Sequence, residues 1–415
     1  MKKIAIIGGG VIGLSCAYYL RKEGHEVVVI DNTDMTDGAS YCNAGHIVPS
    51  HFVPLASPGI VAQGLRWMLN SSSPFYIKPR LDIDLIRWGF TFWRQANERT
   101  MQANIPALQQ LLMLSRELFE DLKNDIGNSF FMKEKGILIV YKTAESEKHE
   151  IALTKQAAQM GMQSQVLTAQ QVQELETSTT INVRGGILYK DDAHLHPGSF
   201  TTALKEYLIE KDVKIISQDA VIDFETSGTA IRSVISKKEK IAADEFILAN
   251  GAWLPSLAKK LGINILMQAG KGYSITYPNY QPNLQYPAIL VDHRVVTTPV
   301  GNDLRLAGTM EINTPGSPMM PKRVKAIVES VKKYYPDLDL PLTDEQTLWS
   351  GLRPLSPDGL PYIGRHSKYT NLVIAGGHAM LGLSLATGTG KLAKEIIQQE
   401  KTSIPSRAFA VERFG

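Results

Sequence analysis

The first 31 residues constrain the fold more than any other stretch of this chain. Residues Ile4–Ile7 form a short continuous apolar run, which is typical of a buried parallel strand. A glycine-rich turn follows at once, then a helical pattern over Leu14–Lys22, and then a second apolar run, Glu26–Ile30, that ends at Asp31. This order predicts a strand–helix–strand unit with two parallel strands.

The glycines of this turn follow the spacing G-x-G-x-x-G at Gly8, Gly10 and Gly13. The first glycine permits a tight turn, the second lets backbone approach a pyrophosphate, and the third lets helix and strand pack closely. The N-terminus of the helix then presents free N–H groups to the phosphates, and Asp31 lies where a carboxylate accepts hydrogen bonds from a ribose. Because strand, helix, second strand and acid occur in the required order, the motif predicts a dinucleotide site.

Length and composition limit the number of domains and the class of protein. A chain of 415 residues exceeds one ordinary core, so two domains are expected, and a net charge of +3 with interspersed signs does not favour nucleic acid. Two cysteines, Cys16 and Cys42, give no disulfide framework and suit a reducing compartment. No apolar run reaches membrane-spanning length. A secretory signal is disfavoured because glycines interrupt the N-terminal apolar stretch and no small-residue cleavage site follows.

Two further segments have alternative interpretations. Residues 191–198 contain His194 and His196 and superficially resemble a metal site, but no other His or Cys has fitting spacing, so a loop entering a helix is preferred and no metal is expected. The segment Ser40 to Pro49 combines small residues with Asn43, which suits backbone passing close to a flat ligand. From spacing alone, an ordinary turn explains this segment equally well.

The rest of the chain predicts an α/β protein, α+β overall. Short strands punctuated by proline and glycine between residues 263 and 314, Gly272–Tyr277 among them, predict an antiparallel sheet. Helical periodicity covers Ile83–Ala96 and Ile105–Leu122, and a second glycine loop, residues 376–382, enters a helix over Leu383–Gln399. Three tryptophans, Trp67, Trp88 and Trp93, are predicted to be core or interface anchors.

We therefore expect a Rossmann-like dinucleotide-binding domain and a discontinuous second domain built on the antiparallel sheet, which would hold the substrate. The first is predicted to comprise residues 1–48, 145–180, 197–260 and 346–415. The second is predicted to comprise residues 49–144, 181–196 and 261–345.

Taken together, these segments resemble the flavin-dependent D-amino acid oxidase and dehydrogenase superfamily over nearly the whole chain. The motifs that carry the resemblance are, in chain order, Gly8-x-Gly10-x-x-Gly13 with Asp31, Ser40-x-x-Asn43-Ala44-Gly45, Leu248–Trp253, Ala307–Glu311, Gly351-x-Arg353-Pro354 and Gly377-His378. Residues 40–80 are most similar to the bacterial D-amino acid dehydrogenase branch of the small-subunit type. The C-terminal motifs are similar to glycine oxidase as well.

The resemblance implies FAD rather than NAD as the cofactor. One branch binds flavin covalently through a cysteine late in the chain; here the last cysteine is Cys42, so noncovalent FAD is expected. The residues implied to hold the ADP half, the flavin ring or the chain between them are Gly8, Gly10, Val11, Ile12, Gly13, Asp31, Asn32, Ser40, Asn43, Ala44, Gly45, His46, Ile47, Val221, Ala249, Asn250, Gly251, Trp253, Gly351, Gly377, Met380, Leu381, Gly382, Leu383 and Ser384.

Three residues are candidates for the catalytic site. Arg353 matches the family's substrate-carboxylate arginine, and a planar guanidinium suits that role because it holds a carboxylate bidentately. A structural ion pair is the alternative. Tyr273 is expected to orient the substrate or, equally, to pack in the core, and His378 is expected to be a flavin neighbour rather than a base.

The mechanism that the resemblance implies needs no strong base. The amino acid binds with a neutral amine, hydride passes from Cα to the flavin N5, and the imino acid hydrolyses to a 2-oxo acid and ammonia. One departure matters: glycine oxidase has an arginine in the loop after the matching histidine, whereas here Ala379-Met380-Leu381 follows. A less polar substrate pocket is therefore expected.

The predicted function is oxidative deamination of a D-amino or imino acid, such as D-proline or hydroxy-D-proline. The alternatives are a glycine/sarcosine-type oxidase that makes hydrogen peroxide, a flavin-bound electron-transfer subunit of a complex, and an NAD-dependent dehydrogenase sharing the first unit. The expected partners are a small amino-acid substrate and an electron acceptor, which is a quinone, an electron-transfer protein or oxygen. The expected location is the cytoplasm, with peripheral association at the inner face of the cell membrane.

Overall fold

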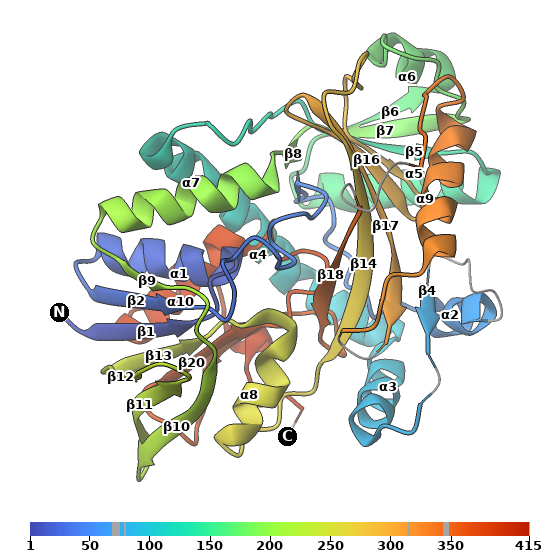
Figure 1. Ribbon diagram of the computed structural model, residues 1–415. Coiled ribbons are helices and arrows are strands. Elements are labelled where there is room, and N and C mark those ends of the chain that lie inside the picture. Colours follow the sequence, from blue (N-terminus) through green and yellow to red (C-terminus); the bar gives the residue numbers. More distant parts are fainter. Residues whose placement is uncertain (69–74, 79, 314–315, 343–347, 415) are drawn as a thin grey trace.

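The structure is a computed structural model. It describes residues 1–68, 75–78, 80–313, 316–342 and 348–414, with backbone only for residues 65–68. Figure 1 shows two sheets lying side by side, with helices packed on each. The predicted fold class, α/β with a Rossmann-like unit and a largely antiparallel second sheet, is confirmed.

The first sheet has six strands in the order β19-β20-β13-β1-β2-β9. Neighbours are parallel except for β19, which is antiparallel to β20. The strands are β1 (Lys3–Ile7), β2 (Glu26–Ile30), β9 (Lys214–Ile216), β13 (Glu245–Leu248), β19 (Tyr362–Arg365) and β20 (Leu372–Gly376). The predicted strand–helix–strand unit therefore lies at the centre of this sheet.

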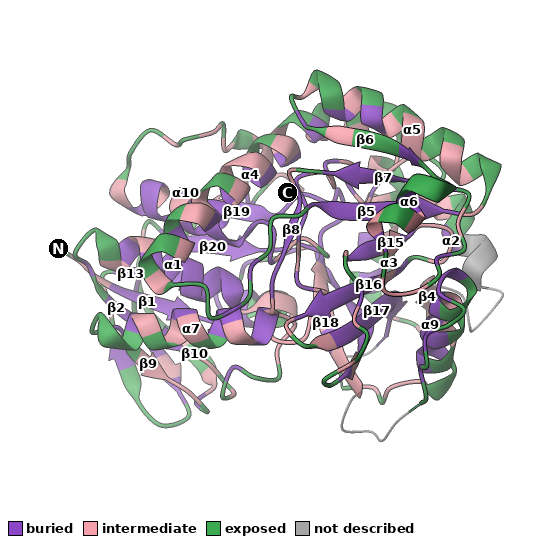
Figure 2. Ribbon diagram, turned by 90° about the horizontal axis from the view of Figure 1, so that it is seen from above, coloured by how far each residue is buried: buried purple, intermediate pink, exposed green. Residues whose placement is uncertain are grey.

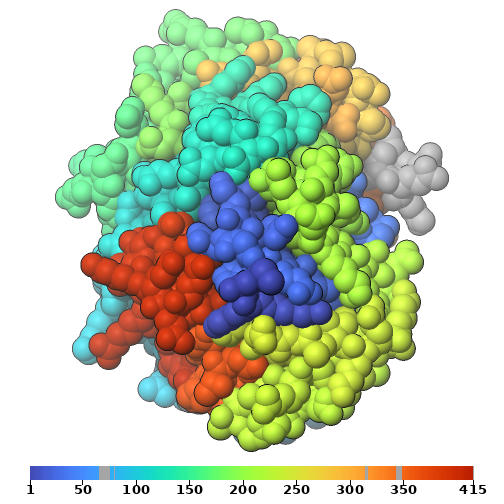
Figure 3. Space-filling model, turned by 90° about the vertical axis from the view of Figure 1, so that its left-hand side faces the viewer, coloured from blue at the N-terminus to red at the C-terminus, as the bar shows by residue number. Residues whose placement is uncertain are grey.

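Alternation along the central strands builds a core on each face of this sheet. Ile4 and Ile6 of β1 pack with helices on one face, whereas Ala5 and Ile7 pack on the other with the small sheet and α8. The helices of the first face are α1 (Val11–Lys22), α4 (Glu98–Ile126), α7 (Pro197–Glu210) and α10 (Ala386–Gln398). The second face is covered by β10 (Val221–Ser227), β11 (Ala230–Ser236), β12 (Lys240–Ala242) and α8 (Leu254–Lys260). Figure 3 shows the two ends of the chain and the β9–α8 region meeting at this end of the molecule.

The second sheet has nine strands, ordered β18-β14-β17-β16-β15-β5-β7-β6, with β4 added beside β17. Pairing is antiparallel apart from β15 with β5 and β4 with β17. The strands are β4 (Phe75–Ile77), β5 (Ile137–Tyr141), β6 (Ser164–Thr168), β7 (Gly185–Tyr189), β14 (Gln268–Tyr277), β15 (Ala288–Leu290), β16 (Val295–Val300), β17 (Asp303–Ile312) and β18 (Leu348–Leu355). Around it lie α2 (Ile60–Met68), α3 (Ile83–Gln95), α5 (Ala144–Gln159), α6 (Ala169–Leu175) and α9 (Pro321–Tyr334).

Four short elements lie outside the larger sheets. They are the paired strands β3 (His46–Ile47) and β8 (Ala193–His194), and the 3-10 turns at Gly251–Trp253 and Arg407–Phe409. Seen from above in Figure 2, buried strands of both sheets face the middle of the molecule, and exposed surface is concentrated on the outer helices. The junction between the sheets is therefore an interior region.

The strand pairing differs in three places from the expected division into domains. Residues 145–180 were expected beside the nucleotide site, but β6 pairs with β7 in the nine-stranded sheet. Conversely, α4 lies within the segment expected for the substrate domain, yet it packs on α1, α7 and α10. Strand β18, expected in the FAD-binding domain, forms the edge of the larger sheet. These pairings depend on distant partners, which the local sequence pattern does not contain.

Some helix limits also differ from expectation. Helix α1 starts at Val11 rather than Leu14, because the Gly10 carbonyl already accepts the Leu14 N–H. Helix α10 starts at Ala386 rather than Leu383, after a turn. Of the predicted tryptophan anchors, Trp88 is buried, Trp93 is exposed, and the side chain of Trp67 lies outside the described residues.

Candidate functional site

A continuous cavity of about 2060 Å³ runs between the two sheets. It extends from the glycine turn of Gly8–Gly10 to Arg353 on β18. Typical pockets for small molecules hold about 300–1,000 Å³, so this one has room for a dinucleotide and a second, smaller ligand. The predicted residues that line it are Gly8, Gly10, Val11, Ile12, Asp31, Asn32, Ser40, Asn43, Ala44, His46, Val221, Ala249, Asn250, Gly251, Trp253, Gly351, Met380, Leu381, Gly382, Leu383 and Ser384.

At one end of the cavity, the glycine turn leaves no room for side chains. A Cβ on Gly13 would lie 1.8 Å from the Gly8 carbonyl oxygen, and one on Gly8, whose φ is +111°, would lie 2.5 Å from that of Ala249. The Ser40 hydroxyl accepts a hydrogen bond from the Val11 N–H at 2.9 Å. The turn therefore packs against its own strand and helix while its open side faces the cavity at the N-terminus of α1.

Asp31 closes this end of the cavity. Its Oδ2 accepts a hydrogen bond from the Gly9 N–H at 2.7 Å, and its Oδ1 accepts one from the Thr33 N–H at 2.9 Å. A carboxylate retains further lone pairs after two such bonds, so it can still accept from a ribose hydroxyl. The backbone thus fixes Asp31 next to the glycine turn, as the motif predicts.

The loop from Ser40 to Gly45 is held in shape from within and from the second sheet. The Asn43 side chain donates to the Ser40 carbonyl at 2.9 Å and accepts from the Gly45 N–H at 2.8 Å. The buried Arg305 donates to the Asn43 carbonyl at 3.0 Å. These contacts favour a fixed ligand-facing loop over an ordinary turn, and Arg305, which the sequence patterns did not single out, is one of its supports.

Ser384 links this loop region to the C-terminal part of the chain. Its hydroxyl donates to the His46 carbonyl at 3.0 Å and accepts from the Val48 N–H at 3.1 Å. The His46 ring pairs with the Thr298 hydroxyl at 2.8 Å, and burial lowers the pKa of His46 to about 3. Segments more than 330 residues apart therefore meet at the cavity, with His46 neutral.

Four residues predicted to bind the cofactor do not line the cavity: Gly13, Gly45, Ile47 and Gly377. Ile47 is buried in the core below α1, and a Cβ on Gly45 would lie 2.2 Å from the Leu195 carbonyl oxygen. Gly377 has a φ of +78° and lies against the Tyr362 ring. These residues support the loops from the side away from the cavity. Their predicted direct contact with the cofactor is therefore corrected to a supporting role.

Arg353 lies at the other end of the cavity and is partly buried. Its Nη1 donates to the Thr309 carbonyl at 2.6 Å, and burial lowers its pKa to about 10. Within the described part of the chain it forms no ion pair with a carboxylate, so the structural ion-pair alternative is not what the contacts show. A Cβ on Gly272 would lie 2.2 Å from this guanidinium, so a side chain there would displace it.

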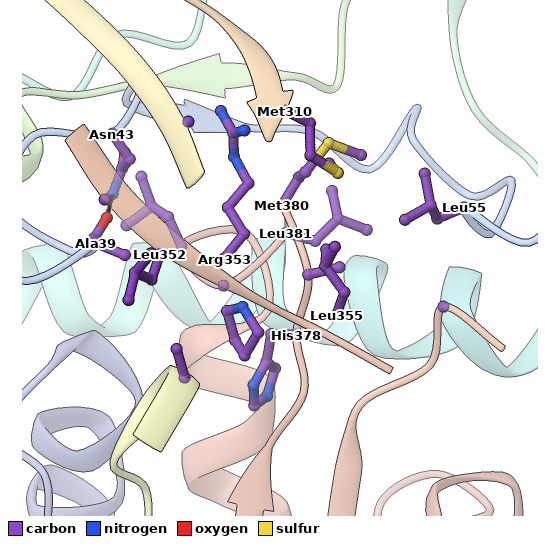
Figure 4. Close-up of a pocket in the computed structure, with 18 of the residues that line it drawn as sticks. Ala39, Asn43, Leu55, Met310, Leu352, Arg353, Leu355, His378, Met380 and Leu381 are labelled. Atoms are coloured by element: carbon purple, nitrogen blue, oxygen red, sulfur yellow. Dashed lines mark hydrogen bonds between the residues drawn. The ribbon is translucent and has the colours of Figure 1, made fainter. Parts of the chain in front are cut away.

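The surroundings of Arg353 are apolar (Figure 4). Met310, Met380 and Leu381 lie near the guanidinium in that view, and Leu55 lies farther along the same side. The less polar pocket expected from Ala379–Leu381 agrees with this arrangement. The sequence patterns gave Met310, Leu55 and Gly272 no place in the site, because only strand pairing and the loop after β3 bring these residues to Arg353.

Tyr273 does not turn its hydroxyl toward Arg353. Its hydroxyl donates to Glu311 Oε2 at 2.6 Å and accepts from the Met320 N–H at 3.3 Å, and the side chain is 1% exposed. Neighbouring residues of a strand point to opposite faces, and Gly272 occupies the face of Arg353. Tyr273 is among the residues that line the cavity, but the contacts of its hydroxyl favour the second of its two expected roles, core packing.

His378 is a buried, neutral neighbour of the cavity. Its Nε2 pairs with the Thr389 hydroxyl at 2.9 Å, and burial lowers its pKa to about 3. In Figure 4 the His378 ring, which follows β20, and the Arg353 guanidinium lie on opposite sides of β18. This placement agrees with a flavin neighbour and not with a base near the Arg353 side chain.

The described residues offer little support for a metal site, a reactive Cys16 thiol or a membrane span. No group of three or more His, Cys, Asp or Glu side chains is placed to hold a metal ion there. Cys16 is buried, and burial raises its pKa to about 12, whereas Cys42 lines the cavity. No helix in the described ranges combines the length and apolar composition that crossing a bilayer requires.

Comparison with known proteins agrees with this geometry. Residues 3–396 match the family model described as FAD dependent oxidoreductase (DAO). The chain is 31% identical to a D-amino acid dehydrogenase of Helicobacter pylori strain J99 over 400 residues, covering 96% of this chain and 95% of that protein. It is likewise 31% identical to a D-amino acid dehydrogenase of Granulibacter bethesdensis over 423 residues, covering both chains fully.

Solved structures share the fold. Glycine oxidase from Geobacillus kaustophilus superposes with a TM-score of 0.79 at 22% identity, covering both chains fully. L-proline dehydrogenase from P. horikoshii superposes with a TM-score of 0.76 at 20% identity, covering 99% of this chain and 97% of that one. At these identities the likeness concerns the fold alone.

Proposed function

The chain belongs to the family of FAD-dependent oxidoreductases, and from that premise we propose that it oxidatively deaminates a D-amino acid or a cyclic imino acid. D-proline and hydroxy-D-proline are the imino acids that we would test first. The D-amino acid dehydrogenases of Helicobacter pylori and Granulibacter bethesdensis, similar over their full length, support this choice.

The residues that line the cavity fit FAD. The glycine turn and the N-terminus of α1 suit the pyrophosphate, Asp31 suits the adenosine ribose, and the Ser40–His46 loop with Gly351 and Gly382–Ser384 suits the flavin. We propose that binding is noncovalent, because the last cysteine of the chain is Cys42 and none occurs late in the chain, where one branch of the superfamily attaches its flavin. Precipitation with acid should therefore release the yellow colour from the protein.

One observation carries the substrate assignment: the partly buried guanidinium of Arg353 borders the cavity and has only the Thr309 carbonyl as a hydrogen-bond partner among the described residues. Its remaining N–H groups are suited to a carboxylate, which would compensate a charge that burial otherwise disfavours. Arg353 would thus anchor the substrate carboxylate and orient Cα.

The chain's other residues position the substrate and exclude water. FAD, when bound, would supply the hydride acceptor. A primary D-amino acid that loses hydride from Cα becomes an imino acid, which water hydrolyses to a 2-oxo acid and ammonia, whereas D-proline becomes a cyclic imine that keeps its nitrogen. Burial lowers the pKa of His378 and His46 to about 3, so both stay neutral at physiological pH and neither adds a charge to the cavity. Met310, Met380 and Leu381 shield the site, which favours substrates with apolar side chains over glycine.

The electron acceptor and location are part of the same proposal. We propose a quinone or an electron-transfer protein as acceptor in preference to oxygen, in a protein that stays inside the cell and associates with the inner face of its membrane. The two free cysteines suit a reducing compartment, and the relatives named as dehydrogenases support an acceptor other than oxygen.

The experiment is a substrate panel on the purified chain. We expect a flavin absorbance spectrum that D-amino acids or D-proline bleach without air, and turnover with an artificial dye that exceeds turnover with oxygen. Bleaching by glycine or sarcosine, with stoichiometric hydrogen peroxide, would favour the oxidase alternative. A flavin that no amino or imino acid bleaches would contradict the proposal and leave an electron-transfer subunit.

A further inference from the structure

Helix α3 carries two separate apolar stripes, and one of them packs on the protein. Leu85 and Trp88 are buried, and the Trp88 ring stacks on Phe92 with centroids 5.0 Å apart. The Trp88 indole N–H donates to the Leu355 carbonyl at 2.8 Å. This stripe accounts for how the helix is attached to the edge of the nine-stranded sheet.

The second stripe faces solvent. Ile83, Ile86, Phe90 and Trp93 are 70%, 60%, 58% and 59% exposed, and Leu81, just before the helix, is fully exposed. At about 100° per residue, these four helical positions fall within an arc of roughly 80°. Large apolar side chains exposed singly need no explanation, but a continuous stripe of them marks an interaction surface.

Basic residues flank this stripe. Arg87 and Arg94 are exposed on its edge, and within the described part of the chain neither forms an ion pair. The nearby acids are already neutralised: Asp82 pairs with Arg80 at 3.0 Å, and Asp84 pairs with Lys259 at 2.5 Å. The surface around the stripe therefore carries net positive charge.

We propose that the stripe of Ile83, Ile86, Phe90 and Trp93 docks into the headgroup region of an anionic lipid bilayer. An apolar helix face bearing Trp, Phe and Ile beside Arg is the pattern of an interfacial helix. In Figure 1, α3 lies at the periphery of the molecule, where a flat surface can reach it. A second copy fits less well, because self-pairing through a two-fold axis would bring the arginines of one copy near those of the other.

Docking on this face would place the cavity beside the bilayer. Trp88 and Phe92 of the packed stripe line the cavity, as does the N-terminal turn of α2 with Ile60 and Gln63. An acceptor dissolved in the lipid would then meet the cavity from the membrane side. The inference thus names the surface for the membrane association proposed above; only its link to the acceptor rests on the proposed function.

The test is flotation of the purified full chain with vesicles. We expect co-flotation with vesicles of phosphatidylglycerol and phosphatidylcholine, and much less with phosphatidylcholine alone. The double variant Phe90→Asp/Trp93→Asp should lose about tenfold or more in vesicle affinity. Replacing Arg87 or Arg94 by Gln should lower affinity for the anionic vesicles about fivefold each.

A matched control is Ile209→Asp on α7, which replaces an apolar residue of similar exposure far from α3 and should leave flotation unchanged. All these variants should keep wild-type turnover with a soluble dye. The inference is overturned if the wild type fails to float with the anionic vesicles, or if the double variant floats as well as the wild type. It is also overturned if ultracentrifugation shows a dimer that the double variant dissociates. A chain that floats but oxidises no amino acid would refute the proposed function and leave this inference standing.

Discussion

An arginine packs against each face of strand β14, and the two arginines have different partners. On the face of Tyr273, Arg323 lies 3.7 Å from Glu311, and both side chains are fully buried. Glu311 also accepts hydrogen bonds from the Tyr273 hydroxyl and from Asn313 at 2.6 and 2.7 Å. On the opposite face, next to Gly272, the described neighbours of Arg353 supply a carbonyl and no carboxylate.

The difference separates a structural charge from one that awaits a ligand. A buried cation is costly unless it is paired, and folding supplies the anion for Arg323. For Arg353 the cavity is the remaining source, so a bound carboxylate would complete the site. Two arginines that pack against the same sheet thus have different roles, and only their partners distinguish them.

The sharpest test of this contrast is Arg353→Leu. Removing the carboxylate anchor should lower kcat/KM for the best D-amino acid by about a thousandfold, or roughly 4 kcal/mol. The flavin spectrum and the thermal midpoint should change little, because no protein anion loses its partner. Steady-state kinetics with a dye acceptor, normalised to bound flavin, measure the effect.

Arg323→Leu is the matched control for Arg353→Leu. It removes the fully buried arginine of the other face, so it should destabilise the protein while the folded fraction keeps its KM. An Arg323 variant that stays stable but raises KM as strongly as the Arg353 variant would break the comparison.

Glu311→Gln should produce the largest loss of stability. It leaves the Arg323 charge buried without its anion, which typically costs about 3–5 kcal/mol. Denaturant unfolding followed by tryptophan fluorescence would measure this loss. The kcat/KM per bound flavin should stay within about threefold of the wild type, since Glu311 lies on the face away from the cavity. A stable variant that loses activity would instead place Glu311 in the site.

The sequence predicts the nucleotide end of the cavity better than the substrate end. The glycine turn, Asp31 and the first two strands lie within 31 residues, so local spacing contains nearly all of the information. Arg353 was predictable as a residue, but its isolation from carboxylates was not. That property depends on Gly272 and Thr309, which reach it through the pairing of β14 with β17 and β18.

The sequence left two roles open for Tyr273 for a related reason. The face on which a strand residue lies follows from register, and the pairing of β14 with β17 shifts between Lys271 and Tyr273. The exposed position of Trp93 could not be deduced either, because α3 has apolar residues on two stripes and either one fits a packed helix. Where a position depends on distant pairing, composition and periodicity leave alternatives open.

Gly272→Ala sharpens the contrast with a smaller change. The new methyl group would lie 2.2 Å from the flexible end of Arg353, so the guanidinium should shift while the strand remains in place. We expect KM to rise about tenfold to thirtyfold with nearly unchanged unfolding midpoint, because misplacing a positioning group weakens carboxylate binding. Gly301→Ala also leaves room for the new methyl group, since the nearest atoms lie 3.6 Å from its Cβ. It is a poorer control for Gly272→Ala, because its φ of +64° would strain an alanine. Gly364→Ala, with 3.6 Å of clearance and no positive φ, should leave KM unchanged.

The smallest expected effect is a pH dependence of carboxylate binding. Burial lowers the pKa of Arg353 to about 10, and only the charged guanidinium attracts a carboxylate strongly. A 2-oxo acid has no amine to titrate, so its Kd should be constant up to about pH 9 and should rise about tenfold per pH unit above pH 10. Flavin difference spectra would measure the Kd. Arg353→Lys should move the rise to lower pH, because an ammonium has a lower intrinsic pKa and suffers the same burial. A Kd that stays flat to pH 11 in both proteins would mean that another cation binds the carboxylate, and the contrast between the two faces of β14 would then lose its functional meaning.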